Sequence, residues 1–150
     1  MPGQLSTGDL EIRHQIYRFF AKHGRAPRST DLVRSARSAE DVGTALIRLH
    51  EAHAIVLEPG GSELRMALPF AAIDTGHTVR SGGASWWANC AWDALAIPIA
   101  LGIDAVIEAT WLDDATPVGL DASNGELSSY DGFIHFCVCA RQWWDDIVET

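Results

Sequence analysis

Apolar residues recur at helical spacing along the first fifty positions of the chain. The run 10–22, LEIRHQIYRFFAK, puts most of its apolar side chains on one stripe, which predicts an amphipathic helix. Gly24 and Pro27 end this helix, and the run 29–31, Ser-Thr-Asp, can cap a short second helix that extends to about Ser35. A third helix is expected to open at residues 38–41. Its buried side would consist of four apolar residues: Val42, Ala45, Leu46 and Leu49.

Two short extended segments, residues 54–58 and 64–68, follow the helices and flank the turn Pro59-Gly60-Gly61. Three helices and a hairpin predict a winged helix-turn-helix domain over residues 1–68. Such a domain raises the question of DNA binding, but its third helix carries Arg48 as its one fixed cation, beside several acidic residues. Recognition helices bring several donors to bases and phosphates. The sequence therefore favours a structural or lid-like role for this domain over a DNA partner.

Residues 69–150 show a different pattern. Residues 69–83 contain two turn signals and predict a loop-rich linker. An apolar stretch from 88 to 101 predicts a helix that Gly102 stops. Strands are expected at 105–110, 118–121 and 132–139. The last of these would be buried on at least one face, and a further helix would occupy 140–149. We expect an α+β protein in which a small mixed or antiparallel sheet with flanking helices follows the winged-helix domain.

Charge is unevenly distributed along the 150 residues. Lys and Arg number 8 against 6 Asp and Glu in residues 1–53, and 3 against 14 in residues 54–150, so the net charges are +2 and −11. An acidic C-terminal part repels nucleic acid and anionic membranes. The longest apolar run, 94–103, is about half as long as a bilayer span requires, and the N-terminus lacks the apolar core of a signal peptide. Three cysteines without such a signal predict reduced thiols in a cytoplasmic protein.

A cysteine and an aspartate in the run 86–93, WWANCAWD, are the strongest candidates for a reactive centre. Cys90 and Asp93 are spaced i and i+3, so on a helix they would lie one turn apart on the same face. Three tryptophans would surround them with an apolar wall that excludes water: Trp86, Trp87 and Trp92. A thiolate is a soft ligand for a soft metal. A carboxyl group whose pKa is raised by burial can hold and deliver a proton near neutral pH.

This spacing alone does not identify a function, because buried cysteines commonly act as small inert hydrophobic residues. Four longer segments carry more information: GHTVRSGG (76–83), WWANCAWDALAIPIALG (86–102), IEAT (107–110) and HFCVCARQWWDDIVET (135–150). Together they strongly resemble the catalytic domain of the alkylmercury (organomercurial) lyases. The resemblance covers about residues 70–150, and its most specific part is the run from Cys90 to Pro98.

The resemblance implies an activity and a site. The family, which serves mercury resistance, cleaves carbon–mercury bonds by protonolysis to a hydrocarbon and Hg(II), without a cofactor. By that resemblance Cys90 is the first catalytic cysteine and the ligand of mercury, which enters as substrate and stays as product. Asp93 is the catalytic acid. The implied partners are an organomercurial or another soft-metal small molecule, and cytosolic thiols.

The chain also departs from the family. A second catalytic cysteine normally follows the WWDDI-type segment, and here the sequence ends at Glu149-Thr150 instead. Either the chain is shortened relative to the family, or this member works without that residue. Cys137 and Cys139 are the candidate auxiliary thiols, because residues i and i+2 on a strand point to the same face. The alternative is that both are small apolar residues that fill a strand. His77 is expected to position its loop over the site rather than to bind metal.

Three functions from different classes are compatible with the sequence. The first is an organomercurial lyase. The second is a non-catalytic homologue that binds a soft metal or a small molecule. The third is a winged-helix regulator whose C-terminal half senses a ligand. Turnover of an organomercurial would separate the first from the other two.

Overall fold

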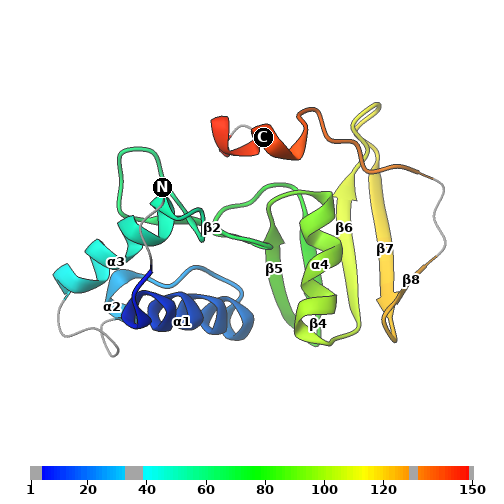
Figure 1. Cartoon of the computed structure of the whole chain (residues 1–150). Coiled ribbons are helices and arrows are strands. Elements are labelled where there is room, and N and C mark those ends of the chain that lie inside the picture. Colours follow the sequence, from blue (N-terminus) through cyan, green and yellow to red (C-terminus); the bar gives the residue numbers. More distant parts are fainter. Residues whose placement is uncertain (1–4, 33–38, 129–131, 149–150) are drawn as a thin grey trace.

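The computed structural model describes residues 5–32, 39–128 and 132–148 (Figure 1). Helix α1 spans Thr7–His23 and confirms the first predicted helix. Ser6 caps it, because its hydroxyl accepts from the Asp9 N–H at 3.2 Å while the Asp9 carboxylate accepts from the Ser6 N–H at 2.9 Å. Gly24 ends the helix in the left-handed conformation, with φ 64°.

Two further helices complete the N-terminal part. Helix α2 spans Ser29–Leu32, and the rest of the predicted second helix lies outside the described residues. Helix α3 spans Ala39–Glu51. All four apolar positions predicted for its inner side are buried, which confirms the helical period read from the sequence: Val42, Ala45, Leu46 and Leu49.

The strands form one sheet in which every described pair is antiparallel. Their order is β1-β2-β3-β5-β4-β6-β7-β8. The bounds are β1 Val56–Leu57, β2 Leu64–Ala67, β3 Phe70–Ala71, β4 Thr78–Ser81, β5 Ala84–Ala88, β6 Ala105–Thr110, β7 Pro117–Ser123 and β8 Glu126–Leu127. The expected α+β architecture with an antiparallel sheet is confirmed, and so is the predicted hairpin of β1 and β2. Because β2 pairs with β3, the sheet continues across the predicted domain boundary at residues 68 and 69.

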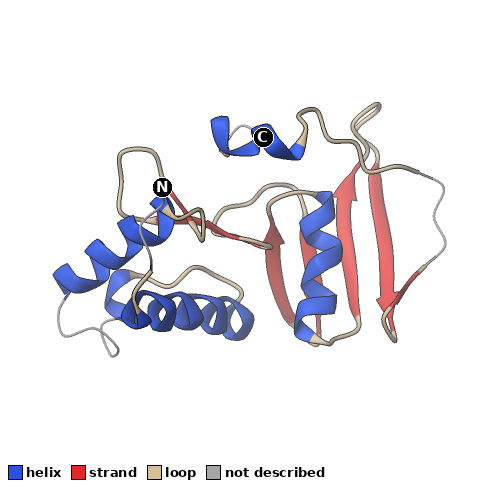
Figure 2. Cartoon of the chain, viewed as in Figure 1, coloured by secondary structure: helices blue, strands red, loops and turns tan. Residues whose placement is uncertain are grey.

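Helix α4 spans Ala91–Leu101 and lies across one face of the sheet (Figure 2). Ala94 and Ile97 point toward the sheet and are fully buried, together with Val79 of β4 and Ile107 of β6. Gly102 ends the helix with φ 63°, as predicted. The start differs from the prediction: residues 84–88 belong to β5, so the helix begins three residues later than expected. A run of large apolar residues is compatible with either state, and pairing with β3 and β4 decides for the strand.

The predictions for two segments were wrong. Residues 69–83 are not simply a linker, because they contain β3 and β4. Residues 132–139 are not a buried strand: they form an irregular segment whose side chains are largely exposed, Phe133 at 96%. The place beside β7 is taken by β8, since the chain reverses at Asn124-Gly125, both with positive φ, and returns along β7.

The C-terminal segment, residues 132–148, crosses the end of the sheet at which β5 and β6 finish and α4 begins (Figure 1). It continues to the N-terminal part, where Trp144 stacks on His53 with ring centroids 3.8 Å apart. Its helix is a short 3-10 turn, Ala140–Asp145, rather than the longer helix predicted for 140–149. None of the helices among the described residues combines the length and the hydrophobicity that a membrane span requires.

Candidate active site

The first turn of α4 brings the predicted thiol and carboxyl together. Cys90 is the N-cap residue in extended conformation, and Asp93 is the third helical residue. These are the two positions whose side chains face each other at a helix start. The Cys90 thiol donates to Oδ2 of Asp93, with sulfur and oxygen 3.5 Å apart. The predicted contact is therefore present, although it arises from a cap rather than from two residues inside a helix.

Both groups have raised pKa values. Burial of the Cys90 thiol raises its pKa, and the neighbouring Asp93 carboxyl adds to this, while nearby backbone N–H groups oppose it. Burial also raises the pKa of Asp93, against the lowering influence of Cys90, Asn89 and His77. A carboxyl group in this setting keeps its proton to higher pH than an exposed aspartate does. The pair thus combines a soft nucleophile with an adjacent proton donor.

The strand ends beside α4 fix the surroundings of this pair. The Ala88 N–H donates to the His77 carbonyl at 2.9 Å, and the Thr75 hydroxyl donates to the Ala88 carbonyl. His77 lies close enough to Asp93 for its charge to act on that carboxyl. The imidazole Nδ1 is 3.2 Å from the Thr75 carbonyl oxygen, which orients the ring. The loop at residues 75–77 and the end of β5 therefore form one hydrogen-bonded support under Cys90.

The three predicted wall tryptophans lie in different places. Trp86 is buried and donates its indole N–H to the Phe20 carbonyl at 2.9 Å, which attaches β5 to α1. Trp87, the next residue on the strand, points to the opposite face and lines a cleft with Lys22 and Arg80. Trp92 is 57% exposed at the start of α4. Trp92 is therefore the tryptophan on the same helical turn as the thiol and the acid.

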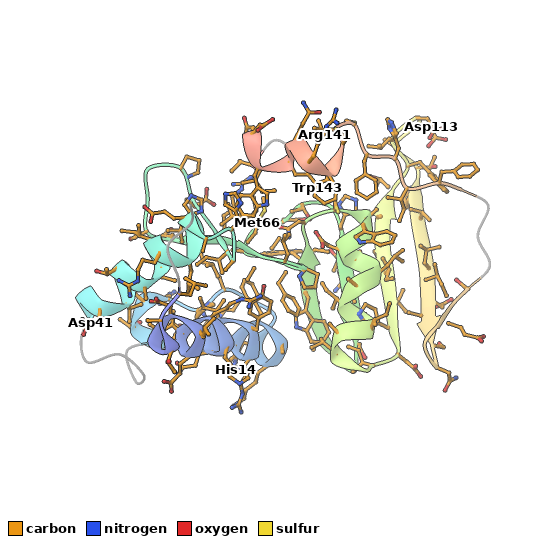
Figure 3. All side chains as sticks on the ribbon, in the orientation of Figure 1. His14, Asp41, Met66, Asp113, Arg141 and Trp143 are labelled. Carbon is orange, nitrogen blue, oxygen red and sulfur yellow. The ribbon has the colours of Figure 1, made fainter. Side chains whose placement is uncertain are left out.

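An aromatic contact ties the C-terminal segment to this turn. Trp92 meets Phe136 at 6.4 Å between ring centroids, and Phe136 meets Trp143 at 5.4 Å. Figure 3 shows Trp143 on the C-terminal helix, above the sheet. Cys137, the neighbour of Phe136, is exposed, as is Cys139, whose thiol donates to Oε1 of Gln142 at 2.8 Å. The expected pairing of the two thiols on one strand face was wrong, because no strand forms there.

With this geometry described, the chain can be compared with known proteins. The family model for alkylmercury lyase matches residues 70–150, which is more than half of the chain. The chain belongs to the alkylmercury lyase family. The matched region contains the whole cluster at the start of α4 together with the C-terminal segment that crosses it.

A solved structure agrees on the fold. The mercury-bound form of MerB2 superposes with a TM-score of 0.66 at 24% sequence identity, over 84% of this chain and 61% of that one. The alkylmercury lyase family member described here thus spans about three fifths of the length of that relative. No curated protein matches the chain.

In this alkylmercury lyase family member, the described residues contain no group of three or more His, Cys, Asp or Glu side chains arranged to hold a metal ion. Cys90 offers one thiol, which is a ligand suited to a soft metal, beside one carboxyl group. The sequence analysis did not predict two residues of the site, Asn89 and Phe136. Asn89 directly precedes Cys90, which was predicted as a site residue, and Phe136 was assigned to a buried strand. Asn89 could have been found from its position, because it is a polar residue between the end of a strand and the cap of the next helix.

Proposed function

We propose that this chain cleaves carbon–mercury bonds by protonolysis, releasing a hydrocarbon and leaving Hg(II). The observation that carries the proposal is the 3.5 Å contact between the Cys90 thiol and the Asp93 carboxyl in a partly buried setting. It fits the family to which the chain belongs. Mercury enters as substrate, bound to carbon, and no further cofactor is needed for the chemistry.

The reaction begins with capture. The Cys90 thiolate takes the organomercury cation from a small thiol of the cell, which leaves with the proton released by Cys90, so that a sulfur–mercury bond joins the protein to the organic group. The carbon–mercury bond then breaks, and its electron pair accepts the proton of Asp93 to form the hydrocarbon. Hg(II) remains on the thiolate, and Asp93 regains a proton from water. The acid must lie beside the carbon that mercury carries, which one helical turn permits.

A second thiolate would help to push electron density toward the carbon. We propose that Cys137 or Cys139 supplies it, or that a cytosolic thiol does. Both cysteines are exposed and follow Phe136, which contacts Trp92 two residues from Cys90. We assign the wall of the substrate pocket chiefly to Trp92. Trp86 and Trp87 belong to β5, the strand that leads into the site, and we propose that they contribute by positioning that strand.

We propose that the N-terminal part is a winged-helix domain with a structural role, and that it does not bind DNA. The cationic groups of α3 and the turn after it have internal partners. Arg48 binds the buried Asp9 with nitrogen and oxygen 2.5 Å apart, His50 lies 3.4 Å from the Ile55 carbonyl oxygen, and His53 stacks on Trp144. Groups held this way are not free to contact phosphates. The reduced thiols favour a cytosolic setting.

The test is the fate of phenylmercury in deuterated water. Protonolysis predicts benzene that carries one deuterium per molecule, released by the parent chain and not by Cys90→Ser. Benzene at the uncatalysed rate, with mercurial still bound one to one, would instead support a non-catalytic soft-metal binder. The exposed pair of cysteines is the feature that favours this second candidate.

A further inference from the structure

One polar side chain at the site has no hydrogen-bond partner. Both polar atoms of Asn89, Oδ1 and Nδ2, are buried and make no hydrogen bond. Among the described residues the one other buried orphan atom is Nε of Arg65, whose guanidinium already binds Glu58 through another nitrogen at 3.2 Å. Asn89 is therefore the one described side chain whose buried polar group is wholly unsatisfied. Leaving buried polar atoms unpaired destabilises the fold, so the retention of Asn89 calls for an explanation.

The position of Asn89 points to the site. It lies between Ala88, the last residue of β5, and Cys90, the cap of α4. Its carboxamide is near enough to Asp93 to act on that carboxyl, although the geometry falls short of a hydrogen bond. The backbone of Ala88 is held on both sides, by the His77 carbonyl and the Thr75 hydroxyl. These two contacts hold the end of the strand from which Asn89 follows.

A carboxamide presents one donor group and one acceptor group side by side. A ligand that satisfies both must itself offer a donor and an acceptor. A hydroxyl group does so, whereas an alkyl or plain aryl group offers neither. A buried polar site discriminates strongly against an analogue that lacks the matching group, since its own polar atoms then stay unpaired.

We propose that Asn89 is a specificity-determining residue that binds a hydroxyl or similar polar substituent on the organic group of the mercurial. The inference rests on the proposed function, because it places the organic group beside Cys90 and Asp93. It selects hydroxylated aryl or alkyl mercurials as the preferred substrate class over unsubstituted ones. It concerns recognition of the part that leaves as hydrocarbon, and it assigns no step of the bond cleavage to Asn89.

The experiment compares phenylmercury with 2-, 3- and 4-hydroxyphenylmercury, which carry the hydroxyl at three distances from mercury. Binding is measured by competition against one small thiol, so that the intrinsic thiol affinity of each mercurial cancels. A chain with Cys137→Ala and Cys139→Ala leaves Cys90 as the sole thiol. We expect at least one hydroxylated isomer to bind about tenfold more tightly than phenylmercury, corresponding to about 1.4 kcal/mol.

The matched variants are Asn89→Leu, similar in size and apolar, and Asn89→Gln, which keeps the amide. The preference should disappear in Asn89→Leu, with phenylmercury bound at least as well as by the parent, and should survive in part in Asn89→Gln. Equal binding of all four compounds, or a preference that persists in Asn89→Leu, would overturn the inference while leaving capture by Cys90 intact. Failure of the parent to bind phenylmercury at all would overturn both this inference and the proposed function.

Discussion

The indole ring of Trp92 meets the phenyl ring of Phe136 edge-on, with centroids 6.4 Å apart and planes at 64°. Trp92 belongs to the helical turn that carries Cys90 and Asp93, whereas Phe136 belongs to the C-terminal segment and directly precedes Cys137. Gly132 at the other side of this segment lies against Trp111, so closely that a Cβ there would come within 2.4 Å of the indole ring. The segment is therefore attached on both sides of its path past the site.

Because the C-terminal segment is held beside the site, we expect its two cysteines, Cys137 and Cys139, to contribute to turnover. The double variant Cys137→Ala/Cys139→Ala should still capture phenylmercury but release benzene at least tenfold more slowly than the parent, because one thiolate activates the carbon less than two. Added small thiol in excess should restore part of the rate. Hydrocarbon release is measured for both chains with and without that thiol. Parent-like release by the double variant without added thiol would show that Cys90 suffices.

Replacement of the capturing thiol should remove binding. In a chain that already carries Cys137→Ala and Cys139→Ala, Cys90→Ser should abolish tight binding of one equivalent of phenylmercury, since a hydroxyl is a hard and poor ligand for mercury. Competition with a small thiol gives the affinity, and circular dichroism shows whether the fold persists. Unchanged affinity would move the site away from the start of α4.

Replacement of the acid should separate binding from turnover. Asp93→Asn keeps the size and the cap geometry but has no proton to give at the carbon. Mercurial binding should stay within a few fold of the parent, and benzene release should fall by at least a factor of about 100. Single-turnover release from preloaded protein measures this step alone. Release at the parent rate would exclude Asp93 as the donor, and loss of binding would make it a structural group.

The raised pKa values of Cys90 and Asp93 predict opposite pH dependences for two steps. Capture needs the thiolate, and because the pKa of Cys90 is raised, the capture rate should keep increasing with pH beyond the range of an ordinary cysteine. Release needs the protonated acid, and because the pKa of Asp93 is raised, release should persist above the range of an ordinary aspartate and then fall. Stopped-flow capture and single-turnover release at several pH values test each step. In Asp93→Asn the descending limb of release should be absent.

The ion pair between Asp9 and Arg48 should stabilise the N-terminal part. Asp9 is 1% exposed, and its hydrogen bonds to Arg48 lower its pKa to about 2 from its ordinary value of 3.8. A lowered pKa means that the stabilisation is present above pH 3.8 and is lost as pH falls toward 2. Asp9→Asn should cost about 1–2 kcal/mol at neutral pH, reduced from the full shift because Arg48 is half exposed.

Urea unfolding of the parent and of Asp9→Asn between pH 7 and pH 2.5 measures this difference, which should shrink as the pH falls. Asp31→Asn is the matched control, since Asp31 pairs with the exposed Arg25 at 3.6 Å and should contribute little. An equal effect of the two substitutions at neutral pH would contradict a special role for the buried pair.

Local pattern was enough to determine several features of this protein. The helical period over residues 10–22 and 42–49 marked α1 and α3 and their buried faces, because a residue's exposure on a helix follows from spacing alone. Gly24 and Gly102 marked helix ends, since each takes a positive φ. The i, i+3 spacing of Cys90 and Asp93 gave the right contact even though the helix began later than expected, because a cap and a helical turn bring the same two positions together.

Other features depended on which elements pair with one another. The run containing Trp86 and Trp87 became a strand because β3 and β4 were available to pair with it, and the direction of each indole followed from that pleat. The strand beside β7 is β8 and not residues 132–139. The connection from β7 to β8 is shorter, so the entropic cost of closing the loop is smaller. The contact of Phe136 with Trp92 joins two segments that are distant in the sequence, and the lack of partners for the Asn89 amide depends on the packing around it. Spacing along the sequence sets which neighbours a residue meets within one element, and only the packing of elements decides what lies opposite them.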